Sequence, residues 1–177
     1  MTAELDDRVG ARTPPRSSLA WIFGIATAFE GLRAGAGTFR VLVDLPARKQ
    51  IGAVAFAQFS RATDLATTGL VFYIVFGVGG LVVTLTTCVA AWRLRAPRKA
   101  VLLSAVAAAC SILVLVATAF AAPIMWAVGS APDNAAVLEP MFDRFTLWTL
   151  LRVLLVDVSF VTILVALVSV LRKSSPD

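Results

Sequence analysis

Four long apolar stretches, separated by short polar segments, dominate the hydropathy pattern of the chain. Each stretch is at least as long as the roughly 20 residues that a helix needs to cross a bilayer. The pattern therefore predicts an all-α membrane protein, a four-transmembrane-helix bundle formed by residues 18–173. We expect residues 1–17 to be a disordered cytoplasmic tail and residues 174–177 to be a second, short one. The predicted spans cover about residues 18–43, 65–92, 100–128 and 145–171.

The polar segments between these stretches differ in character. Residues 47–64 combine apolar positions at helical spacing with charged side chains, which predicts a short amphipathic helix between spans one and two. Such a helix would lie along the membrane surface or cap the bundle. Residues 93–99 form a tight basic turn, and residues 129–141, rich in Pro, Asp and Asn, are expected to be a loop. The apolar stripe of the amphipathic helix is predicted to be Ile51, Ala55, Phe59 and Ala62.

Composition narrows the class of protein further. Of the 177 residues, 59% are hydrophobic and 15% are charged, and the mean hydropathy is +0.86. Soluble domains have about 45–50% apolar and about 25% charged residues, so a water-soluble globule is excluded, as is a disordered chain. The chain has no histidine, and its two cysteines, Cys88 and Cys110, lie apart in apolar runs. We therefore expect no metal site, no cofactor and two unpaired, buried cysteines.

Basic residues near the span ends predict the orientation, because they favour the cytoplasmic side of a membrane. With four spans, both termini share a side. We expect a multi-pass protein of the cell membrane, with both termini in the cytoplasm and the lipid bilayer as its first partner. Nucleic-acid binding is not expected, because the net charge of +5 comes mostly from arginines at helix ends. The terminal side would carry Arg8, Arg12, Arg16, Arg93, Arg95, Arg98, Lys99, Arg172 and Lys173, and the other side Arg48, Lys49, Arg61 and Arg144.

Apart from Arg40 near the boundary of span one, four charged residues remain inside the predicted spans, all on the first and the last: Glu30, Arg33, Arg152 and Asp157. A charge at mid-bilayer costs roughly 2.5–3.5 kcal/mol, so such residues face protein or a cavity and find partners. Measured from the inner ends, Arg33 and Asp157 both lie about 21–22 Å deep, at about 1.5 Å per residue. We therefore predict that spans one and four are adjacent and joined by an Arg33–Asp157 ion pair. A purely structural pair and a polar pocket for a small molecule or proton both remain open.

Three smaller features accompany these charges. Gly31 and Gly35 form a small-xxx-small pattern that lets another helix approach span one closely. Trp148 and Arg152 are four residues apart, as a cation–π pair on one helix face requires. Arg40 lies near the end of span one, where we expect its side chain to extend to the interface.

The order of motifs along the chain carries a resemblance. A Gly-rich charged first helix, Glu30 to Gly35, is followed by Leu45-Pro46 and an amphipathic segment that contains Gln58. Two plain apolar spans come next, and the last span has an aromatic entry, Phe142 to Arg152. Over about residues 20–170 this order resembles the anthrone oxygenase-like family of four-helix membrane proteins. Its characterised fungal members oxidise an anthrone to an anthraquinone with molecular oxygen, and most bacterial members have no assigned function.

The resemblance implies a site for a small aromatic or quinone-like ligand between spans one and four. Thr149 stands where members commonly have Asn or His. Because the chain has no histidine, a buried Glu30 or Asp157 would have to act as the base. The positions that match the family are Glu30, Arg33 and Gly35 on the first span and Trp148 and Arg152 on the last. The candidate ligand-binding residues are Arg33, Gly35, Trp148 and Arg152, and the candidate catalytic residues are Glu30, Asp157 and Arg152.

Three classes of function remain open on the sequence, and whether the protein is an enzyme is left open with them. The first is the aromatic ligand site, with or without oxygenase activity. The second is a non-enzymatic bundle that serves as an assembly partner of another membrane protein or as an envelope accessory. The third is a small transporter, although no inverted repeat is visible and four spans would have to oligomerise to form a path.

Overall fold

The computed structural model describes residues 16–172, and every regular element in this range is a helix. The predicted tails lie outside the described residues, except that Arg16 and Ser17 already belong to the first helix. In chain order the elements are α1 (Arg16–Phe39), the π-helix η1 (Arg40–Asp44), α2 (Leu45–Ile51), α3 (Ala53–Thr63), α4 (Thr67–Arg93), α5 (Arg98–Ser130) and α6 (Ala135–Arg172).

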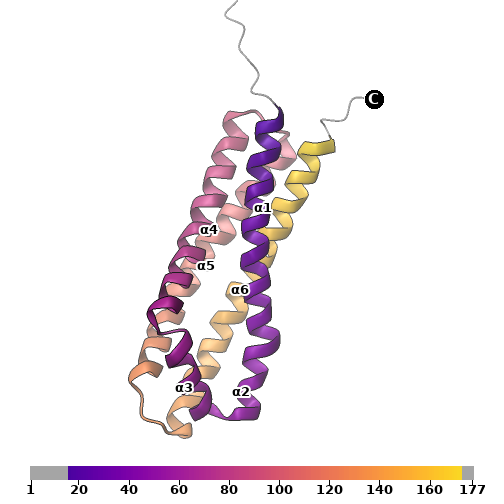
Figure 1. The fold of residues 1–177 in the computed structure, drawn as a ribbon. Coiled ribbons are helices and arrows are strands. Elements are labelled where there is room, and N and C mark those ends of the chain that lie inside the picture. The colour runs from indigo at the N-terminus through magenta and orange to yellow at the C-terminus, as the bar shows by residue number, and fades with distance from the viewer. Residues whose placement is uncertain (1–15, 173–177) are drawn as a thin grey trace, which may run out of the picture.

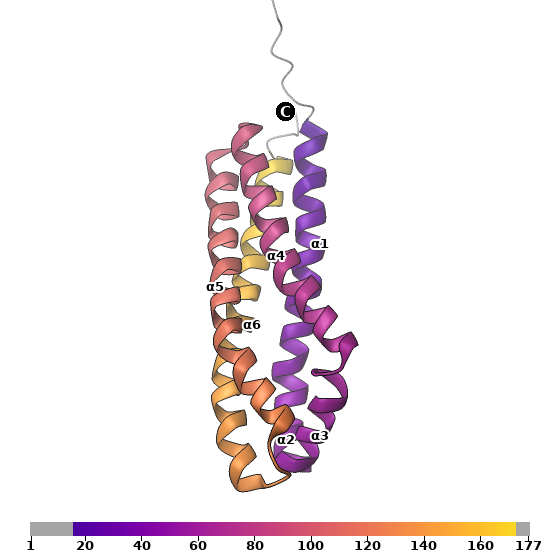
Figure 2. The same cartoon turned by 90° about the vertical axis from the view of Figure 1, so that its left-hand side faces the viewer.

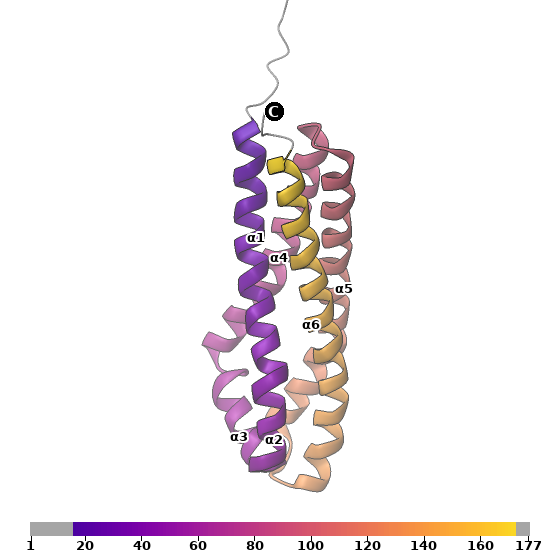
Figure 3. The same cartoon turned by 90° about the vertical axis from the view of Figure 1, so that its right-hand side faces the viewer.

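Four long helices, α1, α4, α5 and α6, run side by side and alternate in direction (Figure 1). α1 packs against α4 and α6, and α5 packs against the same two helices, so the four close into a ring. The start of α1, the end of α6 and the α4–α5 turn lie at one end of the bundle, the terminal end (Figure 2, Figure 3). α2, α3 and the α5–α6 connection lie at the opposite end, the capped end.

Three of these helices, α4, α5 and α6, are long and apolar enough to cross a membrane. α5 has 33 residues and α6 has 38, so at about 1.5 Å per residue each exceeds a hydrocarbon core of roughly 30 Å. The fold is thus that of a helical membrane protein, as the hydropathy pattern predicted. α1 is less apolar than the other three because it contains Glu30 and Arg33, and by length and composition it does not count among the helices that could cross a membrane.

α1 and α6 are neighbours, as predicted for the first and the last apolar segments. A Cβ added at Gly31 would lie 3.2 Å from the ring of Phe160, and one at Gly37 would lie 3.0 Å from Val153. A Cβ at Gly35 would meet nothing within 4 Å. The close approach between these helices therefore uses Gly31 and Gly37, and the predicted role of Gly35 in it is wrong.

After η1, the chain forms two short helices, α2 and α3, and not the single amphipathic helix predicted for residues 47–64. Gly52, with a φ of 84°, separates α2 from α3 in a conformation that glycine adopts without strain. The predicted apolar stripe lies on the exposed side, since Ile51 is 52% and Phe59 is 49% exposed. Helical spacing identifies a face but not its neighbour, and it is a different face of α3 that packs against the bundle. The buried face of α3 consists of Ala53, Phe56, Ala57 and Ser60.

α6 begins at Ala135, within the loop predicted for residues 129–141, so this segment is mostly helical. The side chain of Asn134 accepts a hydrogen bond of 2.9 Å from a backbone N–H in the first turn. Pro140 lies inside the helix, where it lacks a backbone donor. Packing outweighs this loss, because the neighbouring Leu138 is fully buried in the core of the capped end.

Three clusters of buried side chains follow one another along the bundle. The capped-end cluster joins α3, α5 and α6 around Phe56 and Phe142, whose rings meet edge to face at 5.1 Å. The terminal-end cluster is mainly alanine, gathered around Phe23 and Ile163. A smaller middle cluster joins α1, α5 and α6. Small side chains in these clusters let the helices approach closely, as is common in membrane bundles.

Candidate functional site

Charged side chains inside the bundle form two separate clusters. The first is Glu30 with Arg33 on α1, which we call the central pair. The second lies nearer the capped end and brings together η1, α4, α6 and the α3–α4 connection, and we call it the arginine cluster. It consists of Arg40, Asp64, Tyr73, Phe145 and Arg152.

The central pair is closed on itself. Arg33 Nη1 donates to Glu30 Oε1 at 2.6 Å, and the two residues share a face of α1. Glu30 is fully buried and Arg33 is 6% exposed. The guanidinium lies against Gly80 of α4, where a Cβ would come within 1.9 Å of Nη1. The predicted Arg33–Asp157 pair is therefore wrong, because Arg33 finds its partner one turn away on its own helix and Gly80 leaves room for it.

Two serines lie at the level of Glu30, Ser111 on α5 and Ser159 on α6. On each of the three helices, the residue three or four positions from this polar residue toward the capped end belongs to the middle cluster. The residue four positions from it toward the terminal end belongs to the terminal-end cluster. Glu30 Oε2 and both serine hydroxyls are buried and have no hydrogen-bond partner among the described residues. The bracketing residues are Ala34, Val114 and Val156 on one side, and Ala26, Ala107 and Ile163 on the other.

Arg40 is the first residue of η1, and π-helical turns occur frequently at functional sites. Its guanidinium binds Asp64 through two hydrogen bonds, Nη1 to Oδ1 at 2.8 Å and Nη2 to Oδ2 at 2.5 Å. Nη1 also donates to the hydroxyl of Tyr73, which donates to Asp64 Oδ1 at 2.9 Å. The expectation that Arg40 extends to the interface is therefore wrong, because it joins η1 to α4 and to the end of α3.

Asp64 is an ionised member of this network. Burial by itself would raise the pKa of its carboxyl, but the hydrogen bonds from Arg40 and Tyr73 and the charge of Arg40 outweigh that effect. The pKa of Asp64 consequently lies below its ordinary value. The charges of Arg40 and Asp64 therefore cancel within the cluster.

Arg152 is the member of the cluster that has no carboxylate partner. Its guanidinium lies 5.8 Å from the centre of the Phe145 ring, and that of Arg40 lies 5.7 Å from the same ring. Its hydrogen bond to Thr149 Oγ1 is 3.5 Å long, at the limit of hydrogen bonding. No ion pair within residues 16–172 includes it. Since Arg40 and Asp64 cancel, the half-buried Arg152 leaves the cluster with a net positive charge.

The other residues singled out on the sequence lie elsewhere in the bundle. Asp157, half-buried on α6, accepts a long hydrogen bond of 3.4 Å from Thr38 of α1. Trp148 stacks on Phe120 of α5 with ring centres 4.9 Å apart, so its predicted pairing with the arginine four residues on is wrong. Gly35 is exposed on α1. The ligand and catalytic roles that the resemblance implies for these residues stay predictions.

Sequence reasoning missed Asp64 and Tyr73. Tyr73 is the only tyrosine of the chain and lies in a span without any charge. That isolation was a usable signal, because a tyrosine hydroxyl buried among apolar side chains needs a hydrogen-bond partner. Its partners could not be derived from the sequence, because they depend on how α3 folds back against the long helices.

Cys88 and Cys110 are both free, the former half-buried and the latter buried. Within residues 16–172 no group of three or more His, Cys, Asp or Glu side chains is placed to hold a metal ion. The chain matches no protein-family model, and no curated protein or solved structure was found to be similar to it. Its function has to be argued from these clusters themselves.

Proposed function

We propose that the protein is a four-span membrane bundle that binds a small aromatic ligand with oxygen acceptors at Arg152. Such a ligand is what the resemblance to the anthrone oxygenase-like family implies. The observation that carries the proposal is the net positive charge of the arginine cluster. A partly buried charge without an anionic partner is costly, so Arg152 favours a ligand that brings an acceptor to it.

The exposed face of α1 and η1 supports a fourth span. Glu30 and Arg33 turn toward the bundle interior and are almost completely buried. Trp21 and Leu42 lie about 31 Å apart along the helix axis at 1.5 Å per residue, close to the roughly 30 Å of a hydrocarbon core. The exposed residues between 18 and 43 carry no charge, and they are Trp21, Ile25, Ala28, Leu32, Gly35, Ala36, Phe39, Leu42 and Val43.

The distribution of charge supports a cytoplasmic terminal end. The α4–α5 turn, residues 93–99, carries four basic residues, and neither helix contains an acidic one. At the capped end, Arg48 pairs with Asp143 and Arg61 pairs with Asp133, each at 2.6 Å. The basic residues without acidic partners thus gather at the terminal end, and an excess of basic residues favours the cytoplasmic side of a membrane. A reporter that works only in the cytoplasm should be active when it is fused to the carboxyl terminus, and a reporter that works only outside the cytoplasm should be inactive there.

The chemistry around Arg152 fits an oxygen-bearing aromatic ring. A guanidinium has five N–H donors, and Arg152 uses one of them in a long bond to Thr149. A quinone, anthrone or phenolate would supply both an acceptor for these donors and a ring surface next to Phe145.

Binding can be tested with 1,8-dihydroxyanthraquinone as the probe and quenching of tryptophan fluorescence as the readout, in detergent micelles. Arg152→Gln should weaken binding about 10- to 100-fold, because a hydrogen bond from a charged donor contributes about 1.5–3 kcal/mol. Arg144→Gln is the matched control, since Arg144 lies exposed on the same helix. Equal affinity of the two variants, or no quenching in the unaltered protein, would contradict the proposal.

The resemblance extends the proposal to oxygenase activity, in which an anthrone and molecular oxygen give an anthraquinone and water. Asp157 is then the more accessible base, because it is half-buried and its carboxylate accepts a long hydrogen bond from Thr38. Glu30 is fully buried and already bound to Arg33. Oxygen uptake with an anthrone should be lost in Asp157→Asn, whereas uptake unchanged by this substitution would remove Asp157 from the reaction.

The alternative function is a non-enzymatic bundle that assembles with another membrane protein or serves the envelope. The central pair favours it, because Glu30 and Arg33 are paired with each other and almost completely buried, so they offer little surface to a ligand. Under this alternative, a stable membrane protein partner should co-purify from the native membrane. Its recovery should be unaffected by Arg152→Gln and Asp157→Asn.

A further inference from the structure

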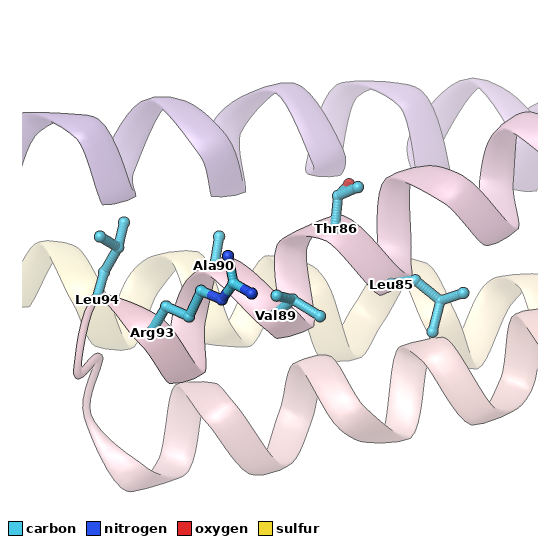
Figure 4. A pocket seen from close by; sticks show the side chains of 6 residues that line it. All are labelled: Leu85, Thr86, Val89, Ala90, Arg93 and Leu94. Carbon is cyan, nitrogen blue, oxygen red and sulfur yellow. The ribbon is translucent and has the colours of Figure 1, made fainter.

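A shallow, open hollow of about 420 Å³ lies on the outer face of α4, close to the terminal end. Figure 4 shows its lining along one face of α4, between α1 and α5. Thr86 contributes little polarity, because its hydroxyl donates to the Val82 carbonyl at 2.7 Å. The guanidinium of Arg93 extends back along the helix toward Val89 (Figure 4). The residues that line the hollow are Leu85, Thr86, Val89, Ala90, Arg93 and Leu94.

Among the residues that the structure describes, the basic turn next to this hollow has no acidic counterpart. Arg93, Arg95, Arg98 and Lys99 are all exposed, and within residues 16–172 none of them forms an ion pair. α4 and α5 contain no Asp or Glu at all. The capped end differs, because arginines there pair with aspartates. The terminal end therefore presents positive charge that the described protein does not neutralise.

The backbone of the turn holds one of these arginines in a costly conformation. Arg95 has a φ of 52°, in the left-handed region where glycine is the usual residue after a helix end. Hydrogen bonds fix the turn, from Arg95 N to the Trp92 carbonyl at 3.2 Å and from Ala96 N to the Ala91 carbonyl at 2.9 Å. Because glycine would adopt this conformation at lower cost, the presence of arginine here is consistent with a functional role for its side chain.

We infer that the hollow and the basic turn together bind one anionic phospholipid, with an acyl chain along Leu85 and Val89 and the phosphate at Arg93 and Arg95. The apolar wall lies toward the bundle centre and the basic residues lie toward the terminal end. A lipid of the inner leaflet has its acyl chains and its headgroup in the same order. Basic pockets beside transmembrane helices recognise anionic headgroups in this way. The inference goes beyond the aromatic ligand site, which lies near the other end of the bundle.

The test uses nanodiscs of phosphatidylcholine that contain a minor share of phosphatidylglycerol, with native mass spectrometry of the released full-length protein. The unaltered protein should retain phosphatidylglycerol in preference to phosphatidylcholine. Arg93→Gln and Arg95→Gln should each reduce that retention about fivefold, because a basic residue near an anionic surface contributes about 1 kcal/mol. Arg93→Lys should retain most of it, and Lys49→Gln, the same loss of charge at the capped end, should leave it unchanged.

A separate variant tests the hollow itself. Ala90→Phe places a ring in the hollow and keeps every charge, so it should reduce phosphatidylglycerol retention, while inorganic phosphate added to the unaltered protein should not displace the lipid. The inference is overturned if phosphatidylcholine is retained equally, if Lys49→Gln lowers retention as much as Arg93→Gln, or if Ala90→Phe has no effect. Circular dichroism of each variant confirms that the helices are intact. Binding of anthraquinone should be the same in all of them, which separates this site from the proposed ligand site.

Discussion

Replacing Gly80 with alanine should break the central pair without altering either charged residue. A Cβ at position 80 would lie 1.9 Å from Nη1 and 2.1 Å from Cζ of Arg33, far inside van der Waals contact. The guanidinium would therefore have to leave Glu30, with which it forms an ion pair of 2.6 Å. Glu30 is fully buried, so its carboxylate would lose its neighbouring cation while still inside the bundle.

Two opposing contributions set the size of this effect. Removing one partner of a buried ion pair costs about 3–5 kcal/mol, because the remaining charge stays buried and uncompensated. Alanine offsets up to about 1 kcal/mol, because glycine is the poorer helix former. We therefore expect Gly80→Ala to lower the free energy of unfolding by about 2–4 kcal/mol.

The matched control is Gly77→Ala on the same helix, because a Cβ at Gly77 would meet Leu115 at an ordinary 3.7 Å. Unfolding in detergent micelles, followed by circular dichroism, gives the free energies for both variants. The measurement is repeated in a background of Glu30→Gln and Arg33→Met, in which neither position carries a buried charge that could lose its partner. The reasoning is refuted if the two glycine variants are equally stable, or if Gly80→Ala is just as costly in the uncharged background.

Three further predictions concern the capped end. Hydrogen bonds from Arg61 and Gln58 hold the pKa of the exposed Asp133 below its ordinary 3.8. The stability that these hydrogen bonds contribute is fully present above pH 3.8 and is lost as the pH falls through the lowered pKa of Asp133 in the folded protein. Below about pH 4 the melting temperature of the unaltered protein should therefore drop more steeply than that of Asp133→Asn. Gly69→Ala should prevent correct folding, seen as loss of the monodisperse peak in size-exclusion chromatography, because a Cβ would lie 2.1 Å from a backbone carbonyl oxygen of α3. Phe56→Ala should lower the free energy of unfolding by about 3–5 kcal/mol, because it removes a buried ring from the core.

The positions of the apolar helices could be predicted closely from the sequence. The span expected at 65–92 is α4, Thr67–Arg93, and the span expected at 100–128 is α5, Arg98–Ser130. Their ends are marked by charged or polar residues, because a bilayer tolerates few charges within a span. The start of α6 could not be predicted, because Pro, Asp and Asn in residues 129–141 indicate a loop, whereas burial of Leu138 and Phe142 holds most of that segment in a helix.

Charge partners were harder to predict than helices. Depth along the spans matched Arg33 with Asp157, but depth alone does not say which way a side chain turns. The partner of Arg33 is Glu30, which the sequence placed on the same face. Asp64 as the partner of Arg40 could not be found from spacing, because 24 residues separate the two and three short helical segments fold between them.

The sequence by itself determined that this is an all-helical membrane protein, because hydrophobic length and the scarcity of charge follow directly from what a bilayer accepts. It also determined which residues share a helix face, because that depends only on the helical repeat. Tertiary structure decided where each face points. Phe56 is buried while Phe59 is exposed, and Arg33 turns to Glu30 because Gly80 of another helix leaves the space. These outcomes depend on the volumes and polar atoms that neighbouring helices bring to each contact, and the helical repeat contains no information about them.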